Sequence, residues 1–244
     1  MSSAAPVTPA HRRTLLSATL VESAALSPEV RLLTFVLADG FRLQFRPGQS
    51  ICIEFETAGK PVLLAYSIAS PPAAGNTFEL CVKAARKESL PERLFALSPG
   101  MQIRFSPPQG DFVLHQADDD KVFLAAGTGI APIRSMIHSV LREPGRRNVR
   151  LLFGARNKES LLFHSEFLAL ERKHPRFRYL PVLSRAAEQW DGARGHVQHH
   201  LAGLLPGPGT AYLCGPLAMV KSASAALVEM GWPGQRVHYD RHGG

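Results

Sequence analysis

A glycine-rich turn follows a short apolar run in the second half of the chain. The run Val122–Ala126 is typical of a strand that is buried on both faces of a parallel sheet. The turn "GTGIAP" comes next, Pro132 suits the first position of a helix, and an apolar stripe with helical spacing begins at Ile133. Glycines let a phosphate approach the backbone, and a helix start offers unpaired N–H groups. A nucleotide phosphate site and an ordinary strand-to-helix turn are equally good interpretations of this pattern alone.

Strand and helix patterns alternate through this half of the chain. Strands are predicted at 121–126, 148–154, 177–183, 210–214 and 235–239, and helices at 132–143, 159–173, 195–204 and 217–230. Strict alternation predicts a doubly wound α/β fold with a parallel sheet, whose ligands bind beyond the carboxyl ends of the strands. We therefore expect four loops to converge on one crevice: Gly127–Pro132, Gly154–Arg156, Leu183–Arg185 and Cys214–Pro216.

The first half of the chain has a different pattern. Short strand-like runs cover residues 15–26, 30–38, 49–56, 63–70, 77–84 and 101–107, with Pro and Gly turns between them. This pattern predicts a closed antiparallel β-barrel, interrupted by one short helix around Pro91–Leu97. The run Asp118–Asp120 is a polar break between the halves. We predict a flexible tail over 1–15, a barrel domain over 16–116 and an α/β domain over 121–244.

Composition limits the classes of function. The chain has 244 residues, 45% hydrophobic and 20% charged, which is long enough for two globular domains. It has no apolar run of about 18 residues, which excludes a membrane span, and no apolar signal core, so we expect a cytoplasmic location. The net charge of +8 suits an acidic protein partner or simply aids solubility. Scattered arginines without interleaved aromatic residues argue against nucleic-acid binding.

Neither the cysteines nor the histidines predict a metal site. Cys52, Cys81 and Cys214 are too widely separated for a zinc site or an iron–sulfur cluster, and they fit a reduced compartment. The histidines of "HVQHH", residues 196–200, have helical spacing, but an exposed polar helix face is the better interpretation. His238, next to the chain end, is likewise interpreted as structural.

Several segments in fixed order carry a resemblance to a known family. "AYSIAS" lies in the predicted barrel, and "GTGIAP", "FGAR", "LSR" and "YLCGPLAMV" follow it. Together they resemble the ferredoxin-NADP reductase superfamily, over about residues 16–242. The resemblance implies a flavin-binding barrel followed by a nicotinamide-dinucleotide domain. It also implies hydride transfer from NADPH to bound FAD, with NADH and FMN as the alternatives. Because no cluster-binding cysteines are present, the electron acceptor would be external: ferredoxin, flavodoxin or an oxygenase component.

The resemblance assigns flavin contacts to the barrel. Tyr66 would pack on the flavin ring, Ser67 would lie near its reactive nitrogen, and Lys83 would also touch the flavin. From the residues alone, a strand tyrosine is more often part of a core.

Two departures from the family pattern weaken the expected flavin phosphate site. The family has an arginine on the flavin phosphate where this chain has Leu64, and leucine cannot replace a bidentate contact. Pro91 stands at the phosphate serine and Glu88 at the glycine before it; Ser89, or the charges of Arg86, Lys87 and Arg93, are possible substitutes. We expect weaker flavin binding than is usual in the family. A reductase of free flavin and a non-catalytic subunit that keeps the fold are the alternative interpretations.

The resemblance also assigns the nicotinamide contacts. The pyrophosphate would lie on Gly127, Thr128, Gly129, Ile130, Ala131 and Pro132, and the nicotinamide on Cys214, Gly215, Pro216 and Met219. A small, polarisable thiol lets the ring come close, although a buried cysteine at a strand end is the simpler interpretation. Asp240 would supply an acid near the nicotinamide, and Tyr239 or His242 a ring over the flavin. Ser67, Cys214 and Asp240 are thus the candidate catalytic residues.

The resemblance places the 2'-phosphate of NADP on a third loop. Ser184 and Arg185 occupy the position concerned, and Arg156 adds a second positive charge. NAD-preferring members of the family often carry an acid after the serine, so the arginine favours NADPH. An exposed loop arginine without a ligand is the alternative for Arg185.

Overall fold

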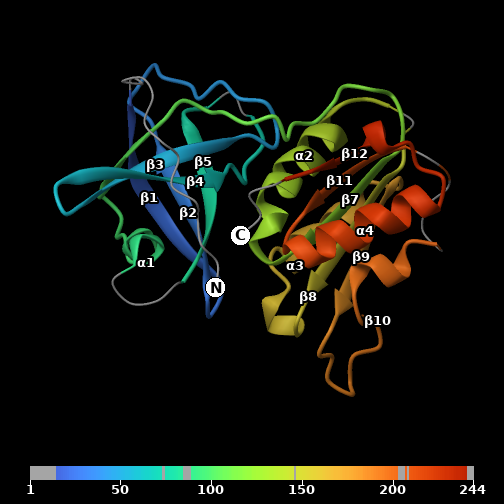
Figure 1. Ribbon diagram of the computed structural model, residues 1–244. Coiled ribbons are helices and arrows are strands. Elements are labelled where there is room, and N and C mark those ends of the chain that lie inside the picture. The colour runs from blue at the N-terminus through green and yellow to red at the C-terminus, as the bar shows by residue number, and fades with distance from the viewer. Residues whose placement is uncertain are drawn as a thin grey trace. The chain divides into compact units, whose positions relative to one another are not determined.

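A computed structural model describes residues 15–72, 75–84, 89–145, 147–202, 207 and 209–240 of the chain. The chain divides into two compact units. The first comprises Met1–Leu114 and Arg134–Ser139, and the second His115–Ile133 and Val140–Gly244. Each unit is built on its own sheet (Figure 1). The residues predicted to form a flexible tail lie outside the described residues, except for Leu15.

The first unit contains an antiparallel sheet that closes on itself. Its strands are β1 (Leu16–Ser27), β2 (Val30–Val36), β3 (Ser50–Thr57), β4 (Lys60–Ser67), β5 (Thr77–Lys83) and β6 (Gln102–Phe105), in the order β4-β3-β6-β1-β2-β5. The two edge strands meet just after β4. Ile68 forms an isolated bridge with Leu80, and the Ala69 N–H donates to the Glu79 carbonyl at 2.8 Å. The predicted antiparallel barrel is confirmed, with helix α1 (Leu90–Phe95) as its predicted short helix.

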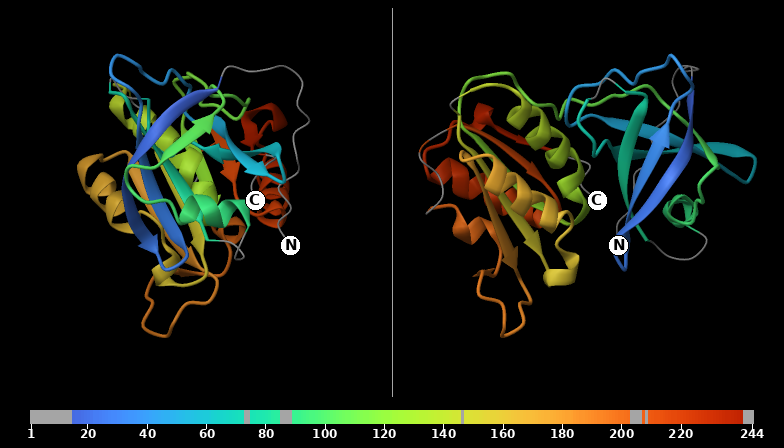
Figure 2. Two further views of the ribbon diagram at one scale, coloured as in Figure 1. Left: turned by 90° about the vertical axis from the view of Figure 1, so that its left-hand side faces the viewer. Right: turned by 180° about the vertical axis from the view of Figure 1, so that it is seen from behind.

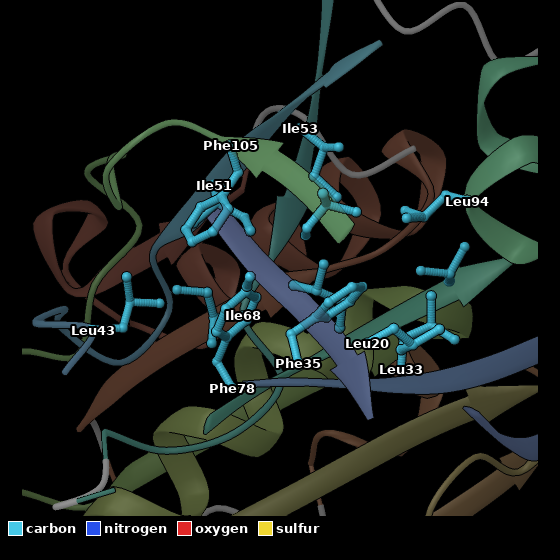
Figure 3. Packing of buried hydrophobic residues seen from close by; sticks show 14 of the residues in the cluster. Leu20, Leu33, Phe35, Leu43, Ile51, Ile53, Ile68, Phe78, Leu94 and Phe105 are labelled. Atoms are coloured by element: carbon cyan, nitrogen blue, oxygen red, sulfur yellow. The ribbon is translucent and has the colours of Figure 1, made fainter. Parts of the chain in front are cut away.

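Alternating side chains fill the interior of the barrel (Figure 3). On β5, Phe78 and Leu80 are fully buried, while the residues at both ends of the strand are exposed. Phe78 stacks on Phe35 of β2 with ring centroids 5.5 Å apart, and it contacts Phe105 of β6 at 5.2 Å. Burying large aromatic rings at the centre fixes the register of three strands, because a slip of one residue would turn these rings outward.

The second unit is a parallel sheet with helices on both faces. Its strands are β7 (Lys121–Ala126), β8 (Val149–Ala155), β9 (Phe177–Leu183), β10 (Ala193–Arg194), β11 (Thr210–Cys214) and β12 (Val237–Tyr239), in the order β10-β9-β8-β7-β11-β12. Its helices are α2 (Ile130–Arg142), α3 (His164–Lys173) and α4 (Leu217–Glu229). Phe167 of α3 packs on Tyr179 of β9, whereas the buried side of α4 packs on the opposite face (Figure 2). The predicted doubly wound fold is confirmed. Among the described residues, no helix has the length and hydropathy needed to cross a bilayer.

One helix predicted from the sequence is wrong. Instead of a helix over 195–204, the described residues of this span contain only a 3-10 helix, Val197–His200, and the short strand β10 (Ala193–Arg194) lies just before it. Gly195 has φ of +97°, which is outside the helical range, and it separates the two. Val197 and Leu201 are buried in the core beside α4, so their spacing reflects burial rather than a regular helix. Residues 203–204 lie outside the described residues.

The helix after the glycine-rich turn begins earlier than predicted. Gly127–Gly129 form a 3-10 turn, and α2 follows directly from Ile130. Pro132 is therefore the third residue of α2, not the first. It is tolerated there because the N–H groups of the first helical turn have no partner within the helix.

The predicted polar break anchors the amino ends of the parallel strands. Lys121 is fully buried at the start of β7, and its ammonium donates to the Asp119 carboxylate and, at 2.9 Å, to the Ala117 carbonyl. The Thr210 hydroxyl donates to the other oxygen of Asp119 at 2.5 Å. The next residue, Asp120, accepts from the Asn148 N–H at 2.6 Å. The acidic run thus ties together the starts of β7, β8 and β11.

The Asp119 contacts predict an acid-dependent part of the folding free energy. Burial acts to raise the pKa of this carboxyl, but the hydrogen bonds from Lys121 and Thr210 outweigh burial and leave the pKa lowered. A lowered folded-state pKa adds stability above the unfolded pKa of about 4 and loses it as the pH falls through the folded value. Asp119→Asn should reduce the free energy of unfolding by about 1.5–3 kcal/mol at pH 7, and the deficit should shrink below pH ~4.

Urea denaturation between pH 3 and pH 7 measures this difference. Asp118→Asn is the matched control, because the Asp118 side chain is 75% exposed. The control should change the free energy of unfolding by less than about 0.5 kcal/mol. A deficit in Asp119→Asn that stays constant over the whole pH range would contradict this account.

Candidate functional site

The carboxyl ends of four parallel strands lie next to one another at one end of the second unit's sheet. Ala126 of β7 pairs with Gly154 of β8, and Ala155 pairs with Leu183 of β9. On the other side of β7, Ala125 pairs with Cys214 of β11. The chain passes from β7 to β8 on one side and returns to β11 on the other, so the strand order reverses beside β7. Such a switch point is where open α/β sheets bind ligands. The predicted convergence of the four loops is confirmed by these registers.

The two glycines of the turn after β7 have different environments. A Cβ atom on Gly129 would lie 2.4 Å from the Cys214 carbonyl oxygen, so only glycine lets the turn pack on the loop after β11. Gly127 has φ of +56°, and a Cβ there would meet nothing within 4 Å. The backbone at Gly127 is therefore open to a ligand, whereas Gly129 is needed for packing.

The start of α2 has the features of an anion site. Thr128 lies in the turn, Ile130 and Ala131 are buried in the first turn of the helix, and Pro132 follows. No side chain caps the helix at Gly129. The Ile130 N–H donates back to the Gly127 carbonyl, so the N–H groups at the start of this helical segment that lack a helical partner are those of the Gly127–Gly129 turn, where a phosphate can bind. The open space above Gly127 lies at the same turn. These residues therefore fit the pyrophosphate of a dinucleotide.

The loop after β11 holds a buried, neutral thiol. Cys214 is 2% exposed, and its thiol donates to Oδ2 of Asp240 at 3.8 Å. Burial, and then the Asp240 charge, raise the pKa of the Cys214 thiol well above its usual value. The Asp240 N–H donates to the Leu213 carbonyl at 3.1 Å, which holds the carboxylate beside the end of β11. Because only the thiolate is a nucleophile, this cysteine is suited to packing against a ligand and not to covalent chemistry.

The residues that follow Cys214 pack closely together. Gly215 has φ of +156°, and a Cβ on it would lie 2.9 Å from the terminal methyl of Met219 and 3.1 Å from the Ala126 nitrogen. Pro216 then precedes α4. The structure therefore brings together five of the predicted nicotinamide-site residues: Cys214, Gly215, Pro216, Met219 and Asp240. Tyr239 is 42% exposed, and His242 lies outside the described residues.

The loops after β8 and β9 place two arginines side by side. The Ser184 N–H donates to the Ala155 carbonyl at 3.0 Å, and the Arg185 N–H donates to the Arg156 carbonyl at 2.8 Å. The sheet ladder thus continues past the strand ends. Arg156 and Arg185 are exposed, and neither guanidinium has a hydrogen bond or ion pair with the described residues. Two such adjacent charges are suited to a phosphate dianion.

In the first unit, the predicted flavin residues lie on two strands. Tyr66 and Ser67 end β4 and are half-buried, and Tyr66 packs against the barrel core. Burial raises the pKa of Tyr66 to about 12, so its hydroxyl stays protonated at neutral pH. Lys83 ends β5 and forms an ion pair with Glu29 at 3.3 Å. Because both side chains are more than half exposed, this pair can open at little cost.

Two of the possible substitutes for the family's phosphate contacts, Ser89 and Arg93, have other partners. The Ser89 hydroxyl caps α1 and accepts from the Glu92 N–H at 3.4 Å. Arg93 donates to the Glu56 carbonyl at 2.9 Å. Leu64 is half-buried on β4, opposite Ile53. Pro91 lies in the first turn of α1, and Arg86, Lys87 and Glu88 lie outside the described residues. Among the described residues, Ser89 and Arg93 are therefore already engaged, and Leu64 offers no charge to a flavin phosphate.

Sequence reasoning missed one residue at this edge of the sheet. The guanidinium of Arg194 on β10 donates to four backbone carbonyls of the loop that carries Ser184 and Arg185. No pattern in the sequence marks it, because its role depends on the direction of those carbonyls. His238 stacks on His115 at 4.4 Å and on Tyr212 at 5.3 Å, in line with its predicted structural role.

A barrel with a Tyr-Ser pair and a doubly wound sheet with a dinucleotide crevice define a class of protein, the two-domain flavin reductases of nicotinamide dinucleotides. Residues 17–114 match the family described as "Oxidoreductase FAD-binding domain", and residues 123–225 match "Oxidoreductase NAD-binding domain". The chain belongs to the ferredoxin-NADP reductase superfamily. It is an NAD(P)H-dependent flavin-containing oxidoreductase, with FAD and a nicotinamide dinucleotide as its cofactors.

Individual proteins in this superfamily are similar over most of the chain. "Ferredoxin--NADP reductase B" of Sorangium cellulosum is 37% identical over 235 residues, which cover 92% of this chain and 96% of that protein. "Phenol hydroxylase P5 protein" of Acinetobacter pittii is 30% identical over 92% of this chain, but the match covers 64% of its own length. The Amycolatopsis cytochrome P450 reductase GcoB has a similar structure, with a TM-score of 0.84 and 26% identity over 96% of this chain and 71% of GcoB.

The two glycines of the turn give a paired prediction. Gly129→Ala should reduce the free energy of unfolding by about 2–4 kcal/mol, because its methyl group would overlap a backbone carbonyl that cannot move aside cheaply. Gly127→Ala should cost about 1 kcal/mol for its positive φ, keep the fold, and weaken dinucleotide binding. Urea denaturation and calorimetric titration with NADP+ measure these effects. If Gly127→Ala binds NADP+ as tightly as the unchanged chain, the pyrophosphate does not lie on this turn.

Proposed function

We propose that this chain oxidises NADPH and delivers the electrons, through FAD, to a separate redox protein, namely ferredoxin, flavodoxin or an oxygenase component. The observation that carries the proposal is the meeting of the Gly127–Pro132 turn with the Cys214 loop at the switch point of the sheet. The similar proteins named as reductases of ferredoxin and of oxygenase systems support the class of acceptor. The net charge of +8 favours an acidic acceptor.

Each predicted residue has a role within this proposal. The N–H groups at the start of α2 bind the pyrophosphate, and Ser184, Arg185 and Arg156 bind the 2'-phosphate. Cys214 presents a small neutral thiol to the nicotinamide, and Asp240 keeps the proton on that thiol by accepting its hydrogen bond. Tyr66, Ser67 and Lys83 hold and orient the flavin ring. When bound, the flavin takes hydride from the reduced nicotinamide and releases electrons one at a time.

Assays of the purified protein with NADPH and three acceptors, namely a ferredoxin, a flavodoxin and added free flavin, test the proposal. A yellow protein that reduces a ferredoxin or flavodoxin with NADPH, faster than it reduces added free flavin, supports it. A colourless protein that reduces only added free flavin would make the chain a free-flavin reductase. That second candidate is favoured by one observation, the leucine at position 64 in place of the family's phosphate arginine.

The leucine at position 64 predicts a gain of flavin affinity on substitution. Leu64→Arg would supply a charge-assisted contact to the flavin phosphate, worth about 1.5–3 kcal/mol. The Kd for FAD should therefore fall roughly tenfold to a hundredfold. Titration of the deflavinated protein with FAD, monitored by flavin fluorescence, measures this Kd. Val62→Arg is the matched control, because Val62 lies two residues earlier on the same face of β4 and is also half-buried. An equal change in both variants would show a general charge effect and contradict the assignment.

The paired arginines predict the choice of nicotinamide. Arg185→Gln removes one of two guanidiniums that have no partner among the described residues. The ratio of kcat/KM for NADPH to kcat/KM for NADH should fall about tenfold or more, mainly through the KM for NADPH. Steady-state reduction of an excess acceptor measures the ratio. A chain that prefers NADH before any substitution would overturn the assignment of Arg185.

A further inference from the structure

A single guanidinium organises the loop between β9 and β10. Arg194, on β10, donates to the carbonyls of Ala186 (3.2 Å), Ala187 (2.9 Å), Glu188 (3.1 Å) and Trp190 (2.7 Å). These acceptors come from successive turns of one short loop, so the backbone curls around the guanidinium. A planar fork with N–H groups pointing in several directions can reach such a set, whereas a lysine ammonium is a compact point charge.

Other contacts of the loop preserve the same shape. The Trp190 ring N–H donates to the Ala193 carbonyl at 3.0 Å. A Cβ on Gly192 would lie 2.6 Å from the Trp190 ring, so the indole packs directly on the backbone there. From the other side, His200 Nε2 donates to the Arg194 carbonyl at 2.8 Å, which holds the backbone of β10 in place. The loop is therefore built around Arg194 and does not depend on burial in the core.

This loop begins with the residues proposed to bind the 2'-phosphate. Arg194 pairs with Leu183 in the sheet, and the Gly195 N–H donates to the Leu183 carbonyl at 2.9 Å. The Arg185 N–H is held by the Arg156 carbonyl at 2.8 Å. The carbonyl of the following residue, Ala186, accepts a hydrogen bond from Arg194. The backbone of Arg185 is thus fixed on both sides, although its own side chain is exposed.

We propose that Arg194 is a positioning residue for dinucleotide selectivity, which holds the loop so that Arg185 is presented in a fixed place to the 2'-phosphate. This inference rests on the proposed preference for NADPH. Its physical basis is preorganisation, because a loop that is already ordered loses less conformational entropy when it binds a ligand. Direct contact between Arg194 and the phosphate is the competing explanation. The four carbonyl acceptors argue against it, since they already engage both terminal nitrogens of the guanidinium.

The test compares Arg194→Lys and Arg194→Gln with a matched control on β9, the strand that pairs with β10. Arg178, at the start of β9, also donates to two backbone carbonyls, those of Pro175 (3.1 Å) and Phe177 (3.0 Å). Arg178→Gln changes the net charge as Arg194→Gln does, but near the start of β9, at the end away from the loop that carries Ser184 and Arg185. The main readout is calorimetric binding of 2',5'-ADP and of 5'-AMP to the full chain, which requires neither catalysis nor bound flavin. The ratio of kcat/KM for NADPH to that for NADH is the second readout.

Both Arg194 variants should weaken binding of 2',5'-ADP roughly threefold to tenfold and leave that of 5'-AMP within about twofold, because only the phosphate contact depends on the loop. Arg178→Gln should leave both within about twofold. In the Arg185→Gln variant, adding Arg194→Gln should weaken the binding of 2',5'-ADP by less than about a further twofold, because the two residues act through one contact. Hydrogen exchange of the amides at 186–190 should be faster in both Arg194 variants.

The contrary results separate this inference from the proposed function. If Arg185→Gln weakens 2',5'-ADP binding but the Arg194 variants do not, the inference fails and the phosphate site stands. If Arg194→Lys binds as the unchanged chain does, or the two substitutions add fully, Arg194 acts by its charge and not through the loop. An equal loss of affinity for 2',5'-ADP and for 5'-AMP in the Arg194 variants would show that Arg194 has a general structural role, which would contradict the inference. If Arg185→Gln has no effect on the choice between the ligands, both proposals fail.

Discussion

The close approach of Gly129 to the Cys214 carbonyl is the constraint on which the dinucleotide crevice depends. A side chain at position 129 would place an atom 2.4 Å from that oxygen, so the turn after β7 and the loop after β11 can pack only without one. The contact lies where the strand order of the sheet reverses. It brings the open backbone at Gly127 and the start of α2, which belong to one turn, together with the end of β11 that carries Cys214, from a distant part of the chain. Packing at a single glycine thereby determines the geometry of the site.

The amino ends and the carboxyl ends of the parallel strands are stabilised by different interactions. At the amino ends, the buried Lys121 ammonium, Asp119 and Thr210 form a network of charged hydrogen bonds that ties neighbouring strands together. At the carboxyl ends, the contacts are backbone packing and the ladder that continues from Ala155 to Ser184. Burying a charged network costs desolvation energy, so such a network is retained where every charged group has a partner. The groups at the amino ends of these strands meet that condition. At the carboxyl ends, the Arg156 and Arg185 guanidiniums have no hydrogen bond or ion pair with the described residues, which suits a phosphate ligand.

Most of the fold could be predicted from the sequence, because apolar runs buried on both faces mark the parallel strands. The predicted spans 121–126, 177–183 and 210–214 match β7, β9 and β11 residue for residue. The helix predicted at 195–204 failed, since a spacing that suits a helix can also arise from two buried residues on either side of a tight turn. Motif order identified the four loops of the crevice. Arg194 could not be found in this way, because no pattern of residue types encodes the direction of backbone carbonyls. The roles of Tyr66, Ser67 and Lys83 came from family resemblance and stay predictions.

Anaerobic mixing of the FAD-loaded protein with NADPH tests the central claim most directly, namely that the crevice binds a nicotinamide whose hydride reduces the flavin. The account predicts that the flavin absorbance bleaches in a single turnover, and that it bleaches more slowly when one of the two hydrogens at C4 of the nicotinamide is replaced by deuterium. A flavin that stays oxidised while NADPH is bound in stoichiometric amount would contradict it.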